Sequence, residues 1–142
     1  MTNSCELTFA DIEILSGLAG VKDEDAEEAP DSPLAEWYAR VRKRPLREFN
    51  AADICTTISQ TLYLKYTVLV ALDWLRQDLL TGPLYKGQLL HAMGNIREDF
   101  WCVHDAERAE FEALLHAVSR DCRDFDQIYI RALLNTLERS KH

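Results

Sequence analysis

The sequence predicts an all-α fold, a compact single-domain bundle of about five to seven helices. Apolar residues recur three and four positions apart along most of the chain, and no sustained alternation typical of strands occurs. Only five Gly and four Pro interrupt the 142 residues. With 47% hydrophobic and 28% charged residues, the chain has the composition of a globular protein that can bury a core.

The first predicted helix begins near residue 31 and ends before Pro45. Asp31 or Ser32 can serve as its N-cap, and Pro33 suits the first turn. The stretch "FNAADICTTISQ", residues 49–60, predicts a second helix that is capped by Asn50, with Asp53 three residues on as a capping-box variant.

A central buried helix is predicted over residues 63–80. The stretch "TLYLKYTVLV", residues 61–70, would also suit a buried strand, but Leu69, Leu72 and Leu75 continue it at helical spacing. The Gly82–Pro83 pair ends this helix, and a short helix follows over about residues 87–93.

Residues 95–101, "NIREDFW", predict an N-capped turn that is anchored by Phe100 and Trp101. From Asp105 onward no Gly or Pro occurs, and apolar residues recur in a 4-3-4-3-4 pattern, so the sequence predicts either one long helix or two helices with a bend near Asp121. The members of the pattern are Phe111, Leu115, Val118, Cys122, Phe125 and Tyr129. The expected core includes Trp37, Leu46, Ile58, Leu64, Leu72, Leu75, Leu89 and Trp101.

Charge is distributed unevenly along a chain whose net charge is −8. Residues 1–36 carry ten acids and one lysine, residues 37–47 carry five bases, and the remainder sums to −4. This balance repels nucleic acid at long range and favours basic partners. We expect residues 1–30 to form a less ordered acidic segment.

The basic stretch "RVRKRPLREF", residues 40–49, has two interpretations. It could bind nucleic acid or serve as a nuclear-localisation signal, but the surrounding field is negative. The favoured interpretation is structural: Arg40, Arg44 and Arg47 lie near a helix C-terminus and pair with the acids of residues 23–36.

No constellation of residues indicates catalysis, a cofactor or a metal. The four cysteines, at positions 5, 55, 102 and 122, and the scattered histidines lack metal-ligand spacing. Neither His104 with Glu107 and Glu110 nor the stretch of Ser119, Asp121 and Cys122 forms a recognisable nucleophile–base pair. We therefore expect no enzyme activity.

The chain has no run of eighteen apolar residues and does not begin with a basic segment followed by an apolar one. We therefore expect neither membrane insertion nor a secretory signal, and a cytoplasmic location.

The order of features over residues 31–101 resembles the immunity proteins of bacterial contact-dependent growth inhibition (CDI) systems. The similarity rests on "RKRPLREF", on Ile58, Gln60, Leu64 and Tyr66, on "VALDWL", on "PLYKGQLL" and on the closing "DFW". The sequence departs from the pattern at Tyr63, where a small residue is expected, and at Leu69, where proline is frequent. Residues 102–142 then form a helical tail that is longer than expected.

The resemblance implies a protein that binds and neutralises the C-terminal toxin domain of its cognate system, in a 1:1 heterodimer and in the bacterial cytoplasm. The toxin is expected to be a nuclease, with tRNA among its candidate substrates, because an acidic inhibitor can imitate the nucleic-acid backbone. In this interpretation Leu46 and Phe49 contact the core, and the bases around them lie outside it. The alternative function is that of a helical adaptor or regulatory module that binds proteins through an apolar groove.

Two acidic groups are the candidate toxin contacts. The N-terminal acidic group consists of Asp23, Glu24, Asp25, Glu27 and Glu28. The second acidic group consists of Glu98, Asp99, Asp105 and Glu107.

Overall fold

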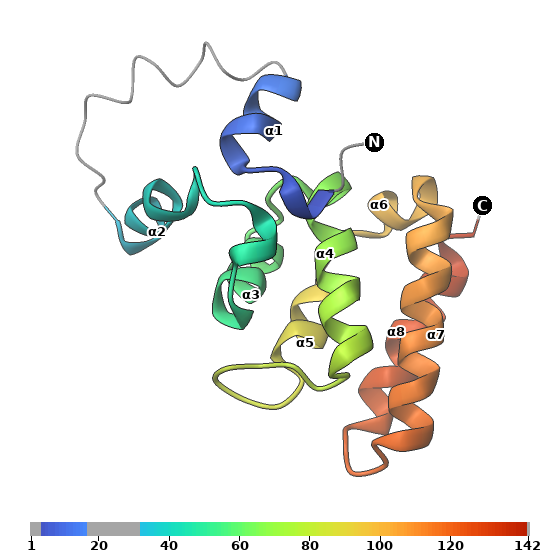
Figure 1. Ribbon diagram of the computed structural model, residues 1–142. Helices are drawn as coiled ribbons and strands as arrows, with labels where there is room; N and C mark the ends of the chain where they lie inside the picture. Colours follow the sequence, from blue (N-terminus) through green and yellow to red (C-terminus); the bar gives the residue numbers. More distant parts are fainter. Residues whose placement is uncertain (1–3, 17–31, 142) are drawn as a thin grey trace. The chain divides into compact units, whose positions relative to one another are not determined.

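The computed structural model describes residues 4–16 and 32–141, and within them every regular element is helical. These residues contain eight α-helices, one more than the upper bound predicted from the sequence (Figure 1). The contacts divide the chain into two units, Met1–Asn50 and Ala51–His142, which are described separately. In the described part of the chain, no helix is long and apolar enough to span a bilayer.

The first unit contains the additional helix, α1 (Phe9–Leu15), in a segment that the sequence analysis expected to be less ordered. Thr8 and Asp11 form a reciprocal capping box at its start, with both hydrogen bonds at 3.0 Å. Phe9 and Ile12 are completely buried. The pattern Thr-x-x-Asp beside two apolar residues three positions apart could have indicated this helix.

Helix α2 (Pro33–Val41) confirms the predicted start, because the Ser32 hydroxyl accepts a hydrogen bond from the backbone N–H of Ala35. A 3₁₀ turn, η2 (Leu46–Glu48), follows Pro45, and a further turn, η1 (Ser4–Glu6), precedes α1. The backbone N–H of Leu46 donates to the carbonyl of Leu7 at 2.9 Å, which joins these two turns.

Aromatic side chains form the core of the first unit. The ring of Phe9 stacks on Tyr38, with centroids 5.1 Å apart, and meets Trp37 and Phe49 edge-on. Leu46 and Phe49 are buried, as predicted, whereas Trp37 is only half-buried.

Two bases of the basic stretch pair with acids that lie before residue 17. Arg42 pairs with the buried Glu13 at 2.6 Å, and Arg47 pairs with Glu6 at 3.1 Å. Glu13 belongs to α1 and Glu6 belongs to the η1 turn before it, so α1 and η1 each supply one of these counter-charges. Of the acids predicted as partners, those at 23–31 lie outside the described residues.

The second unit contains helices α3 to α8. Helix α3 (Ala51–Ser59) packs against α4 (Leu64–Gln77) and α5 (Gln88–Gly94), and α4 packs against α7 (Asp105–Asp121). Helix α6 (Glu98–Val103) contacts both α7 and α8 (Gln127–Arg139), which lie side by side (Figure 1). The chain between α7 and α8 confirms the predicted bend after Asp121.

The core of the second unit follows the predicted apolar pattern. Trp101 stacks on Phe111 with centroids 5.3 Å apart, and Leu64 is the one predicted member of this core that is only partly buried. The predicted residues that are at most 1% exposed are Ile58, Leu72, Leu75, Leu89 and Trp101.

The backbone of the turn between α3 and α4 explains why a small residue is expected at position 63 in the family pattern. Thr61 and Tyr63 adopt left-handed backbone angles, with φ of 53° and 51°. Glycine adopts this conformation without steric cost, whereas residues with a Cβ do not. A small residue such as glycine at position 63 would therefore suit the same turn.

Candidate functional site

Only the second of the two acidic groups lies in the described part of the chain. We call this group, which consists of Glu98, Asp99, Asp105 and Glu107, the α6–α7 group. All five residues of the N-terminal acidic group lie outside the described residues. The α6–α7 group is described in full: Glu98 and Asp99 lie in the first turn of α6, and Asp105 and Glu107 lie in the first turn of α7. Carboxylates at these positions favour helix formation because they offset the positive end of the helix dipole.

Most of the α6–α7 group is paired with cations. Glu98 pairs with Arg139 of α8 at 3.0 Å. Asp99 lies 3.5 Å from Arg97, and Asp105 lies 2.7 Å from Arg108. The carboxylate of Glu107 makes no ion pair within the described part of the chain.

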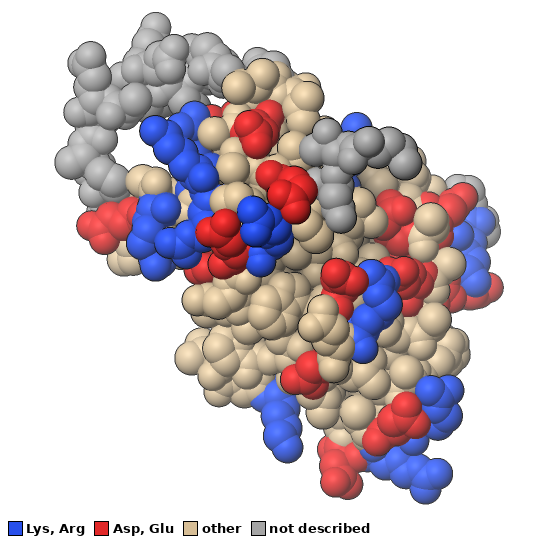
Figure 2. Space-filling view, viewed as in Figure 1, with Lys and Arg blue, Asp and Glu red and all other residues tan. Residues whose placement is uncertain are grey.

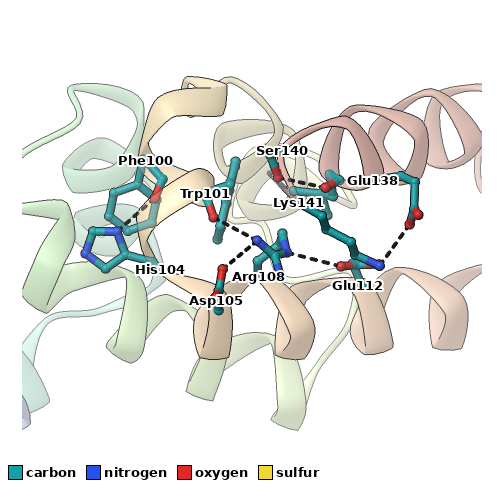
Figure 3. A network of polar contacts seen from close by, with 10 residues as sticks. Phe100, Trp101, His104, Asp105, Arg108, Glu112, Glu138, Ser140 and Lys141 are labelled. Atoms are coloured by element: carbon teal, nitrogen blue, oxygen red, sulfur yellow. Dashed lines mark hydrogen bonds and ion pairs between the residues drawn. The ribbon is translucent and has the colours of Figure 1, made fainter.

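Arg108 connects this group to the interior (Figure 3). Its side chain is 11% exposed, and its Nη1 donates to the Trp101 carbonyl at 3.2 Å as well as to Asp105. Its Nε, which has no hydrogen bond, lies 3.6 Å from Glu112. Lys141 then bridges Glu112 and Glu138, at 3.3 and 2.8 Å, and these contacts raise the pKa of its ammonium group.

This network leaves a surface of mixed charge. Red and blue side chains lie next to one another over α7 and α8 in the space-filling view (Figure 2). The sequence shows the acids of residues 98–112 as a cluster, but their partners Arg76 and Arg139 come from distant positions on other helices. Arg97, Arg108 and Arg139 therefore offset part of the negative charge of the α6–α7 group.

The sequence motifs weighed for catalysis have structural partners. The Ser119 hydroxyl donates to the side-chain oxygen of Gln127 at 2.8 Å. Asp121 pairs with Arg120, whose hydrogen bond lowers the pKa of that carboxyl. The ring of His104 stacks on Phe100, with centroids 4.0 Å apart, and its Nδ1 lies 2.8 Å from the Phe100 carbonyl. Across residues 4–16 and 32–141, no three His, Cys, Asp or Glu side chains gather as a metal site requires.

A second surface was not identified by the sequence analysis. It lies between the α4–α5 connection and the α7–α8 turn, at one end of the second unit (Figure 1). A groove of about 590 Å³ separates these segments. Its lining residues are Leu80, Lys86, Arg120, Asp121, Cys122, Arg123, Asp124 and Phe125.

Aromatic side chains connect the α4–α5 segment with the α7–α8 turn and the start of α8. The imidazole of His91 lies between three rings, with centroid distances of 5.7 Å to Tyr85, 5.6 Å to Phe125 and 4.6 Å to Tyr129. Burial raises the pKa of the Tyr129 hydroxyl, and the nearby Tyr85 raises it further. The sequence signal for this surface is the apolar pair Leu84–Tyr85, which directly follows Gly82–Pro83 and therefore lies in a loop.

Comparison with known proteins gives one match. A family model described as CDI immunity proteins matches residues 21–111, which is more than half of the chain. No curated protein and no solved structure matches the chain significantly. The match includes the basic stretch, the central helix and the α4–α5 loop described above. The chain therefore belongs to the family of CDI immunity proteins.

Proposed function

We propose that the chain binds the C-terminal toxin domain of its own CDI system as a 1:1 complex in the bacterial cytoplasm and that this toxin is a nuclease. The immunity role follows from the family match over residues 21–111. The choice of a nuclease rests on charge: residues 1–36 carry a net −9 in a chain of net −8. Nucleases that hold phosphates have basic clefts, which attract such an acidic partner. tRNA is one candidate substrate for this toxin.

The N-terminal acidic group is the first candidate contact with the basic cleft. Its five carboxylates fall within the six residues 23–28, which contain no base. By contrast, three of the four carboxylates in the α6–α7 group have a cation within ion-pair distance. A basic toxin would have to compete with those cations, so the α6–α7 group is the second candidate.

The direct test is triple charge reversal of Asp23, Glu24 and Asp25 to Lys. The toxin domain encoded beside this gene would be co-expressed with each variant, and binding would be followed at several salt concentrations. We expect slower association, a weaker dependence on salt and loss of protection. Chemical unfolding of the variant checks that it is still folded.

The matched control reverses Glu98, Asp99 and Glu107, which changes the net charge equally at a different place. Equal loss in both variants would show that net charge alone matters. Full protection by the first variant would exclude the N-terminal acidic group as the contact. If the wild-type chain neither binds nor neutralises the neighbouring toxin, the proposed pairing is wrong.

The alternative is a helical adaptor. An adaptor that uses apolar contacts should bind several partners in a manner that changes little with salt. Binding of one partner with a steep salt dependence supports the immunity function over the adaptor.

A further inference from the structure

We propose that Leu84, Tyr85 and Ile128 form an apolar docking surface for the toxin domain, separate from the acidic contact. This inference rests on the proposed function and assigns a second part of the same interface. All three residues belong to the second unit. We call them the apolar surface below.

The exposure of these side chains is the first observation. Leu84 is 82% exposed, Ile128 is 84% exposed, and Tyr85 is 52% exposed. Leu84 and Ile128 are the two most exposed large apolar residues among those described. Exposed apolar side chains that gather at one end of a molecule are typical of interaction sites, whereas single scattered ones are ordinary.

Packing beneath the surface brings the three residues to the same end. Tyr85 contacts His91, and His91 contacts Phe125 and Tyr129. Tyr129 directly follows Ile128 in the sequence, and Phe125 lies three residues before it. Gly87 lies so close to Phe125 that an added Cβ would come within 2.4 Å of its ring. These contacts hold the α4–α5 loop close to the start of α8.

The backbone that carries the apolar surface is fixed by hydrogen bonds. Gly87 N–H donates to the Leu80 carbonyl at 3.0 Å, and Leu84 N–H donates to the Gln88 side chain at 3.0 Å. At the other side, the Asp126 carboxylate caps α8 by accepting from Tyr129 N–H at 3.1 Å. A surface that is already ordered loses little entropy on binding, which favours affinity.

Charge around the apolar surface is balanced. Lys86, Arg123 and Arg131 make no ion pair with another described residue, and Asp124 and Asp126 lie in the same turn. The surface therefore lacks the negative excess of the rest of the chain. It also lacks the dense positive charge that nucleic acid or an anionic membrane requires. Tyrosine and arginine around aliphatic side chains are typical of protein–protein contacts.

We assign the toxin domain as the binding partner of the apolar surface because the chain belongs to the CDI immunity proteins. The family match ends at residue 111, so Arg123, Ile128 and Arg131 lie in the part of the chain beyond it. Leu84 and Tyr85 lie inside the match, so the proposed surface combines residues from both parts of the chain. The two surfaces then have different tasks: the acidic contact speeds association, and the apolar surface slows dissociation.

The test measures association and dissociation rates separately for the toxin domain encoded beside this gene. The variant carries Leu84→Ala and Ile128→Ala. We expect its dissociation to be at least about tenfold faster, as for central apolar contacts, with the association rate and its salt dependence unchanged. Val103→Ala is the matched control, because Val103 is 74% exposed on α6 in the same unit. It should change both rates by less than about twofold.

The outcomes separate this inference from the proposed function. If the double variant dissociates like wild type while the Asp23, Glu24 and Asp25 reversal still impairs association, the apolar surface is not a contact and the immunity function stands. If wild type binds no toxin, the proposed function itself fails. Sedimentation showing a wild-type dimer that the double variant converts to monomers would assign the surface to a second copy instead. Co-sedimentation of wild type with anionic vesicles would assign it to a membrane.

Discussion

The carboxylate of Glu13, which has no solvent exposure, accepts hydrogen bonds from two nitrogen donors of Arg42: Nη2 lies 2.6 Å from Oε1, and Nε lies 3.1 Å from Oε1 and 2.9 Å from Oε2. The Tyr38 hydroxyl is a third donor, at 2.6 Å. One base of the stretch 40–49 thus neutralises a buried charge on α1. This pairing explains part of a basic cluster that in isolation would suggest nucleic-acid binding.

Arg42→Ala should destabilise the chain strongly. Removing one partner leaves a buried carboxylate without its counter-ion, which costs about 3 kcal/mol or more in other proteins. Arg47→Ala is the matched control, because its pair with Glu6 is half-exposed on both sides and should contribute about 0–1 kcal/mol. Chemical denaturation of both variants measures the difference. Equal, small effects would contradict the structural role of the Glu13–Arg42 pair.

Leu72→Ala should lower the free energy of unfolding by about 2–5 kcal/mol, because Leu72 is 1% exposed and its loss leaves a cavity. Leu69 lies on the same helix and is 42% exposed, so Leu69→Ala controls for the change in helix propensity. Its effect should be much smaller. A loss below about 0.5 kcal/mol for Leu72→Ala would place that side chain outside the core.

Thr61→Gly should stabilise the turn between α3 and α4. The threonine is exposed and holds a φ of 53°, which costs a residue with a Cβ about 1–2 kcal/mol. We expect the free energy of unfolding to increase by up to about 1 kcal/mol in thermal or chemical unfolding. The increase is smaller than the strain that is relieved, because glycine also gives the unfolded chain more entropy to lose on folding. Thr56→Gly, within α3, should instead destabilise by about 0.5 kcal/mol, the difference in helix propensity between the two residues. A loss of stability in both variants would contradict the strain at position 61.

Cys55 should resist alkylation in the folded protein. Burial raises the pKa of its thiol to about 11, so the reactive thiolate is scarce near neutral pH. Cys5, Cys102 and Cys122 are partly exposed and should react first with iodoacetamide, as peptide mass spectrometry can show. Adding denaturant should bring Cys55 to the rate of the other three. Early labelling of Cys55 under native conditions would contradict its burial.

The same shift has a consequence for stability at high pH. The folded thiol ionises at a higher pH than the unfolded one, whose value is about 9. The unfolded state therefore loses this proton first, and the free energy of unfolding should decrease as pH rises from about 9 to 11. Cys55→Ala should show a shallower decrease than wild type over that range.

The sequence alone determined the helical class, the order of helices α2 to α5 and the family. These features depend on local signals: the spacing of apolar residues, Ser32 with Pro33 at a helix start, and Gly82–Pro83 at a helix end. Such signals act within a few residues, so they can be read without knowing what packs against them. Helix α1 carried a local signal as well, in Thr8 and Asp11, but the acidic composition around it concealed that signal.

Only the tertiary structure decided which charges remain available and which apolar side chains stay exposed. Glu98 and Glu110 are neutralised by Arg139 and Arg76, which lie 41 and 34 residues away in sequence. Ile128 is apolar but 84% exposed, whereas Ile130 on the same helix is buried. Charge pairing and burial depend on neighbours brought together by folding, and the order of residues in one chain does not specify those neighbours locally.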